Sequence, residues 1–247
     1  MPTTLTVLFG LGILSGVTTA LFGFGGGFVT VPVIYAVTGA MHVAVGTSAA
    51  VMLVNALGAT VTVVRAGRLR RRYVWPLGGF VALGAGLGAL AATRVADGLL
   101  HALFAAYLGL TIVDSVLRRG FLAGGAPRPL GRGTASAGGA GIGAVAAFLG
   151  VGGSVLTVPL LRRHGLPMSE ATALANPLSL PVAAVATAVY LLAPGPSAVD
   201  TVAAGLLLAG SLPTIAVLRR WAPVIPDRAH AVAYLVLLGA ALVAVLT

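Results

Sequence analysis

The chain is a succession of long apolar runs separated by short polar stretches, and this pattern limits what it can fold into. The runs cover residues 5–22, 24–38, 43–64, 73–92, 98–117, 134–150, 151–161, 170–192, 199–218 and 228–247. Several approach the roughly 20 residues that a helix needs to cross a bilayer. Only 8% of the residues are charged, against roughly 25% in soluble domains, which excludes a soluble enzyme. We therefore predict an all-α polytopic membrane protein.

The charged residues are mainly arginines at the ends of these runs. Basic residues number 15 against 5 acidic ones, for a net charge of +10, and every basic residue is arginine. The clusters are Arg65 to Arg72, Arg118–Arg119, Arg162–Arg163 and Arg219–Arg220. Such clusters between apolar runs are typical of cytoplasmic loops. A nucleic-acid-binding protein would spread this charge over a soluble face, so no nucleic-acid partner is expected.

The two halves of the chain repeat one another. A shift of 127 residues places Gly23, Gly25 and Gly26 on Gly150, Gly152 and Gly153, and Thr30-Val31-Pro32 on Thr157-Val158-Pro159. The shared block G-x-G-G-x-x-x-T-V-P has no gap in either copy, which indicates an internal repeat. We therefore divide the chain into a first membrane repeat (1–117), a cytoplasmic linker (118–133) and a second membrane repeat (134–247).

Two topologies fit the glycine clusters, and the charge pattern separates them. If each cluster interrupts a single crossing helix, the halves run parallel, and Arg162–Arg163 and Arg219–Arg220 fall outside. If each cluster is the tip of a helical hairpin, all four arginine clusters lie inside, as the positive-inside rule favours. The predicted fold is therefore two inverted-topology repeats, each a Gly-tipped helical hairpin plus three transmembrane helices. This topology puts both termini outside the cytoplasmic membrane.

The two glycine clusters form the predicted substrate site. Backbone without helix is tolerated at membrane depth only where it is buried in protein or lines a cavity, and glycine lets a ligand come close. New helices are expected to begin at about Phe28 and Val155, and their free amides and positive dipole ends suit an anion. Close helix packing is the alternative, and it is the preferred interpretation of Gly84 and Gly88. The predicted contacts in the tips are Gly23, Gly25, Gly26, Gly27, Gly150, Gly152, Gly153 and Ser154.

Hydroxyl and amide side chains after each tip extend this site. Thr47 and Ser48 follow the first hairpin, and Asn176 takes the corresponding place in the second half. Such groups bind oxyanions, and they also serve as helix caps or interhelical hydrogen bonds. Pro177 and Pro181 are expected to disrupt the helix at that point. The further candidates are Thr30, Asn55, Thr157 and Ser179.

The acidic and histidine residues offer no clear site for a coupling ion. Asp114 lies four residues before Arg118, which favours an ion pair within one helix, with proton coupling as the alternative. Glu170 is interpreted as a helix cap, whereas Asp97 and Asp227 are placed in loops. No pair of histidines has metal-ligand spacing, and cysteine is absent, so no metal and no cofactor are expected.

The sequence resembles the sulfite exporter TauE/SafE family of membrane transport proteins. The resemblance lies in Gly23 to Pro32 followed by Ala44 to Ser48, and in Gly150 to Pro159 followed by Leu180 to Ala183. It covers nearly the whole chain except the central loop. The resemblance implies export of a small sulfur oxyanion or organosulfonate, such as sulfite or sulfoacetate. The chain departs from the family pattern at Ala173-Leu174-Ala175, where the family tends to repeat Gly-Thr-Ser, so another small anion stays open as the substrate.

The predicted function is a membrane transporter, an exporter, of a small anion. The anion would bind between the two glycine tips near the membrane midplane and cross by alternating access. No catalytic residue is expected, because Ser15 and Ser48 have no histidine base within the spans. A non-transporting membrane assembly subunit and an anion channel are the alternatives. The expected partners are the anionic substrate and the lipid bilayer, and a homo-oligomer is left open.

A tag on Thr247 tests the predicted topology. We expect the tag to be reachable from outside intact cells, because the hairpin topology returns the C-terminus to the outer face. A tag within the linker 118–133 is the control and should be reachable only after permeabilisation. A Thr247 tag that is protected in intact cells would contradict the inverted repeats.

Overall fold

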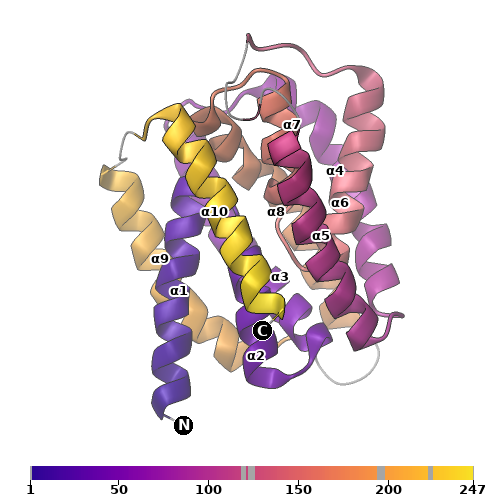
Figure 1. Ribbon diagram of the computed structural model, residues 1–247, viewed down its shortest axis with the longest axis vertical. Coiled ribbons are helices and arrows are strands. Elements are labelled where there is room, and N and C mark those ends of the chain that lie inside the picture. Colours follow the sequence, from indigo (N-terminus) through magenta and orange to yellow (C-terminus); the bar gives the residue numbers. More distant parts are fainter. Residues whose placement is uncertain (1, 118–120, 122–125, 194–197, 222–224, 247) are drawn as a thin grey trace.

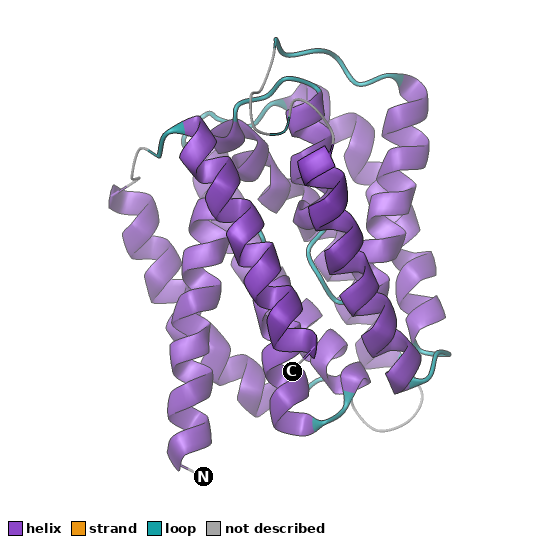
Figure 2. Ribbon diagram, in the orientation of Figure 1, coloured by secondary structure: helices purple, strands orange, loops and turns teal. Residues whose placement is uncertain are grey.

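The protein is a bundle of helices. The computed structural model describes residues 2–117, 121, 126–193, 198–221 and 225–246. Every regular element in these residues is helical (Figures 1 and 2). The helices are α1 (Pro2–Phe22), α2 (Gly27–Thr38), α3 (Met41–Arg65), α4 (Arg71–Ala92), α5 (Asp97–Leu117), the π-helical turn η1 (Thr134–Gly138), α6 (Gly139–Phe148), α7 (Ser154–Arg163), α8 (Met168–Leu192), α9 (Thr201–Trp221) and α10 (Asp227–Leu246). Residues 118–120 and 122–125 of the predicted linker lie outside the described residues.

Seven of the described helices are long and apolar enough to cross a membrane: α1, α3, α4, α5, α8, α9 and α10. Their outward faces are apolar as well. Leu87 on α4 is 71% exposed and Leu110 on α5 is 70% exposed. Side chains of this kind suit hydrocarbon rather than water, because a soluble monomer rarely exposes large contiguous apolar patches. The prediction of an all-α multi-pass membrane protein is confirmed.

Two of the three shorter α-helices, α2 and α7, follow breaks at the two glycine clusters. α1 ends at Phe22 and α2 begins at Gly27, and α6 ends at Phe148 and α7 begins at Ser154. The expected helix starts are thus confirmed to within one residue. Gly23 and Gly150 each end the preceding helix with a positive φ, 73° and 64°. This left-handed conformation is favourable only for glycine, which explains why each break begins with this residue.

The two hairpins open toward opposite ends of the bundle (Figure 1). The chain termini and the open ends of α1 and α2 lie at the lower end of the view, whereas the open ends of α6 and α7 lie at the upper end. The end of α5 and the start of η1 also lie at the upper end. The last residues of α7 and α9 there carry Arg162, Arg163, Arg219 and Arg220.

The helices pack in pairs that join the two halves of the chain. α1 packs against α9, α4 against α6, and α3 against α8. Small residues make these contacts close: a Cβ atom added to Gly84 would overlap the carbonyl oxygen of Ala140, and one added to Gly12 would overlap that of Leu207. Gly88 meets Ala144 in the same way. The packing role predicted for Gly84 and Gly88 is confirmed, as expected for small residues between membrane helices.

Helix α8 contradicts one expectation. It continues without a break from Met168 to Leu192, although Pro177 and Pro181 lie inside it. The prediction that these prolines disrupt the helix is therefore wrong. α8 packs against α3, α4 and α7, so its backbone is enclosed by other helices. Proline is tolerated in such membrane helices because neighbouring groups compensate for the lost hydrogen bond.

The glycines of α4 test the close packing. Gly84→Ala places a methyl group on the Ala140 carbonyl, so we expect the free energy of unfolding to fall by roughly 1–3 kcal/mol. Gly86→Ala is the control, because its methyl group would lie 3.7 Å from Val185, an ordinary contact. Thermal unfolding in one detergent compares the variants. Equal Tm values for both variants would contradict the packing argument.

Candidate functional site

Each glycine of the first tip lies where a side chain would overlap another part of the molecule. A Cβ on Gly23 would overlap the carbonyl oxygen of Thr172 in α8, and one on Gly26 would overlap the Ser15 hydroxyl. Gly26 also caps α2, since its carbonyl accepts hydrogen bonds from the Val29 and Thr30 amides at 3.0 Å. The first tip is therefore a tightly enclosed backbone loop, because only glycine fits at these positions.

The two tips are in direct backbone contact. A Cβ on Gly27 would lie 2.9 Å from the Gly150 carbonyl oxygen and 3.0 Å from the Gly152 amide nitrogen. A Cβ on Gly152 would lie 2.8 Å from the Phe24 carbonyl oxygen. The fold thus brings the two repeated glycine clusters together, although they are more than a hundred residues apart in the chain. In this conformation no side chain separates them.

Ser48 links the two tips through its hydroxyl. Its Oγ donates to the Gly150 carbonyl of the second tip at 2.8 Å. It also lies 2.7 Å from Thr30 Oγ1 and 3.2 Å from the Gly27 carbonyl, both in the first half. All of these residues except the glycines come from helices α2 and α3, and all are buried. A hydroxyl can donate one hydrogen bond and accept two, so Ser48 suits this position between the backbone segments of the two tips.

Asn55 and Thr47 join the first half to helix α9. Asn55 Nδ2 donates to the Gly25 carbonyl at 3.5 Å, and its Oδ1 accepts from Ser211 of α9 at 2.8 Å. Thr47 faces elsewhere, because its hydroxyl accepts the Asp200 amide at the start of α9 at 2.8 Å. The structure therefore brings Ser48, Thr30 and Asn55 to the first tip, whereas Thr47 holds the connection before α9.

The second tip has fewer polar partners. Ser154 Oγ lies 3.4 Å from the Gly152 carbonyl, and Thr157 lies in the first turn of α7 beside Gly153. Asn176 lies instead near the first tip: its Nδ2 donates at 3.5 Å to the Thr19 carbonyl of α1, which also accepts the Gly23 amide. Its Oδ1 and the hydroxyl of Ser179 are buried without a hydrogen-bond partner among the described residues, although buried polar atoms usually have one.

Ser15 is a candidate that the sequence did not single out as a contact. Its hydroxyl lies against Gly26 and has no hydrogen-bond partner within the described part of the chain. Ser15 lies in the middle of an apolar run on α1, so neither its spacing nor a neighbouring motif distinguishes it. Only the return of the chain at the first tip places its hydroxyl beside the break.

The acidic side chains form hydrogen bonds and ion pairs at helix ends rather than at the glycine tips. Asp97 begins α5 and accepts the Met41 amide of α3 at 3.0 Å, and it also pairs with His42. Asp227 begins α10 and accepts the Met168 amide of α8 at 2.6 Å. Asp227 is also paired with the buried Arg162 at 2.7 Å. These caps correct the sequence-based placement of both aspartates in loops, because each lies in the first turn of a helix.

Asp114 pairs with Arg163 of α7. Arg118, its predicted partner, lies outside the described residues. The ion pair ties α5 to the end of the second hairpin, which the spacing within one helix did not suggest. Glu170 does lie in the first turn of α8, as expected of a cap, and it pairs with Arg70 at 2.9 Å.

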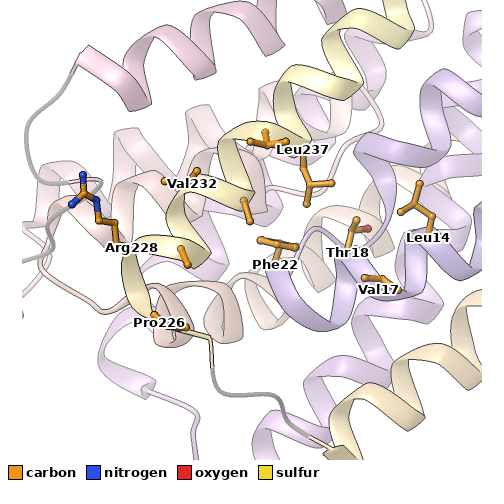
Figure 3. Close-up of a pocket in the computed structure, with 11 residues that line it drawn as sticks. Leu14, Val17, Thr18, Phe22, Pro226, Arg228, Val232 and Leu237 are labelled. Carbon is orange, nitrogen blue, oxygen red and sulfur yellow. The ribbon is translucent and has the colours of Figure 1, made fainter.

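Two large grooves on the flanks of the bundle are apolar. One has a volume of about 880 Å³ and lies between α1 and α10. Figure 3 shows Leu14, Phe22 and Leu237 facing into it, with Arg228 at one end. The other has a volume of about 800 Å³ and is lined mainly by α4, α5, α6 and α7. Such surfaces suit lipid chains better than a small anion, because burying a charge against apolar groups is costly.

Comparison with known families agrees with this architecture. The family model described as "Sulfite exporter TauE/SafE" matches residues 8–245, which include both glycine tips and nearly the whole chain. No curated protein and no solved structure matches the chain significantly.

Ser48→Ala tests the hydrogen bond between the tips. The variant leaves the buried Gly150 carbonyl without its donor, so we expect the free energy of unfolding to fall by about 1–3 kcal/mol. Ser136→Ala is the control, since that hydroxyl bonds only to carbonyls of its own helical turn. Thermal unfolding measures both. A Ser48→Ala protein as stable as Ser136→Ala would show that this bond does not hold the tips together.

Proposed function

The chain belongs to the sulfite exporter TauE/SafE family, and on this premise we propose that it exports a small sulfur oxyanion or organosulfonate across the cell membrane. Family membership makes it a membrane transport protein of a sulfite or anion exporter type. The observation that carries the finer proposal is the meeting of the two glycine tips, one from each half of the chain.

The two halves are proposed to be inverted repeats. Support comes from the sequence shift of 127 residues and from the two hairpins, which open toward opposite ends of the bundle. The helix pairs agree: the shift relates α1 to α6 and α4 to α9, so the pairs α1–α9 and α4–α6 are one contact made twice. With the arginine-bearing helix ends facing the cytoplasm, both termini lie outside.

The substrate is proposed to bind at the tips. The helices α2 and α7 begin there, and the first amides of a helix have no intrahelical partners and carry a positive dipole. Ser48 and Thr30 lie at these starts, and the unpartnered hydroxyl of Ser15 lies beside Gly26. Asn176 and Ser179 are proposed as further contacts, since each has a buried polar atom without a partner among the described residues. The site holds dipoles and no fixed charge. It therefore can bind an anion and release it again, as a transporter must.

The contact between the tips supports the proposal of alternating access. The direct contact of Gly27 with Gly150 and Gly152 closes the path in this conformation. For an anion to pass, the hairpins must separate, and the bond from Ser48 to Gly150 must break. The first hairpin packs against α9 through its helix α1, and the second packs against α4 through its helix α6. The α1–α9 and α4–α6 pairs can therefore rock against one another.

Flux of ³⁵S-labelled sulfite in proteoliposomes tests this function. Gly27→Ala puts a methyl group within 3.0 Å of the second tip and prevents closure, so we expect sulfite flux to fall by about tenfold. Gly205→Ala is the matched control, because nothing lies within 4 Å of its new methyl group. Thermal unfolding confirms that both variants are folded.

The same assay separates the alternatives. Saturable sulfite flux that is competed by sulfoacetate supports a carrier. Flux that rises linearly with sulfite concentration would indicate a channel, and the absence of wild-type flux with every anion tried would favour an assembly subunit. Equal sulfite flux in Gly27→Ala and Gly205→Ala would show that the tips are not part of the transport path.

A further inference from the structure

A polar cavity of about 430 Å³ lies beside the first glycine tip. Five elements contribute to it: the end of α1, the α3–α4 connection, the start of α8, the end of α9 and the start of α10. Ala20 and Leu21, which line it, directly precede the tip, and Thr172 lines it as well. The Thr172 carbonyl is the group that Gly23 contacts. The cavity therefore lies at the arginine-rich end of the bundle, next to residues that adjoin the first tip.

The lining of this cavity is positively charged. Arg68 and Arg219 both line it, and no carboxylate does. The two nearest acidic residues at this end have other partners: Glu170 is bound to Arg70 at 2.9 Å, and Asp227 is bound to Arg162 at 2.7 Å. The two arginines are thus not neutralised by an acidic residue within the lining. A concave surface of one charge sign concentrates ions of the opposite sign.

The guanidinium group of Arg219 is hydrogen-bonded to α3, and one of its N–H donors has no partner among the described residues. Its Nη1 donates to the Ala59 carbonyl of α3 at 3.0 Å, which fixes the guanidinium group. Its Nε is buried and has no hydrogen-bond partner among the described residues. An unsatisfied buried donor is costly, and it is more so on a charged group. The residue as a whole lines the cavity, so its positive charge would attract an oxyanion there.

The start of α8 adds one hydroxyl donor, that of Ser169, to the same cavity. Ser169 and Thr172 lie in its first two turns and line the cavity. Thr172 Oγ1 donates its proton to the Met168 carbonyl at 2.9 Å, so towards other groups it can act only as an acceptor. Ser169 is exposed, so its hydroxyl is available as a donor. The positive end of the helix dipole favours an anion here as well.

We propose that this cavity is an anion-binding vestibule, in which Arg68 and Arg219 hold a small oxyanion before it reaches the glycine tips. The assignment of the vestibule to a transport path rests on the proposed function. The anion-binding site itself depends only on the cavity and on the two arginines that line it. The ligand is a small mono- or divalent oxyanion such as sulfite, and the phosphate of an anionic lipid has the same chemistry.

Trp221 provides a probe of this site, because it lies two residues after Arg219 and the chain has only 2 tryptophans. In a Trp75→Phe background, the fluorescence of Trp221 is titrated with sulfite in lipid-free detergent. We expect a saturable change whose Kd rises about tenfold in Arg219→Gln, as for loss of a charge-assisted hydrogen bond. Arg68→Gln, at an exposed position, should weaken binding as well. Arg220→Gln is the matched control, since Arg220 does not line the cavity, and it should keep the wild-type Kd.

Two further measurements make the result decisive. Thermal unfolding of Arg68→Gln and Arg219→Gln shows whether each variant is folded, and Arg68→Gln alone suffices if Arg219→Gln is not. A parallel titration with phosphatidylglycerol replaces sulfite. A response to the lipid but not to sulfite would make this a lipid headgroup site and overturn the proposal.

The proposal and the transport function can fail separately. If wild-type protein transports sulfite but both arginine variants bind it as tightly as Arg220→Gln, the vestibule is overturned and transport stands. If wild-type protein binds sulfite in an Arg68- and Arg219-dependent way but shows no flux, the anion site stands and the transport function fails. No sulfite binding in any variant would also overturn the vestibule.

Discussion

The structure depends on how polar backbone is satisfied at two helix breaks inside a membrane-spanning bundle. Open backbone in hydrocarbon costs several kcal/mol for each unsatisfied group, so a break persists only where protein surrounds it. Here the two breaks surround each other. Gly27 lies against Gly150 and Gly152, and the Ser48 hydroxyl donates to the Gly150 carbonyl. Asn55 supports the first tip by donating a hydrogen bond to the Gly25 carbonyl. Neither break would be satisfied in this way without the other.

The same contact between the tips fits the proposed alternating access. The tips touch through glycines and one hydroxyl, so little surface has to separate. The hairpins are held instead by their partners α9 and α4, where Gly12 and Gly84 allow helices to approach closely. Rigid pairs joined by a narrow contact are suited to rocking motions. In the proposed mechanism, the cavity lined by Arg219 attracts the anion near the end of α1, and the anion then passes between the tips.

The sequence predicted the features that depend on local pattern. The duplicated glycine clusters predicted both helix breaks, and Gly84 and Gly88 predicted close packing, because a missing side chain has a direct geometric meaning. It did not predict features that depend on tertiary placement. Pro177 is tolerated inside α8 because other helices enclose it. Ser15 lies beside the first tip, and Arg219 lines a cavity together with Arg68, only because distant helices meet. No spacing along the chain encodes these contacts.

Hydrogen–deuterium exchange at the tips tests the central claim most directly, because the claim concerns backbone amides. Exchange is followed by mass spectrometry in peptides covering residues 23–32 and 150–159, with and without sulfite, in purified protein that transports it. Binding between the tips predicts slower exchange in both peptides together, and no change in a control peptide from α5. Unchanged exchange in both tips at saturating sulfite would contradict the account.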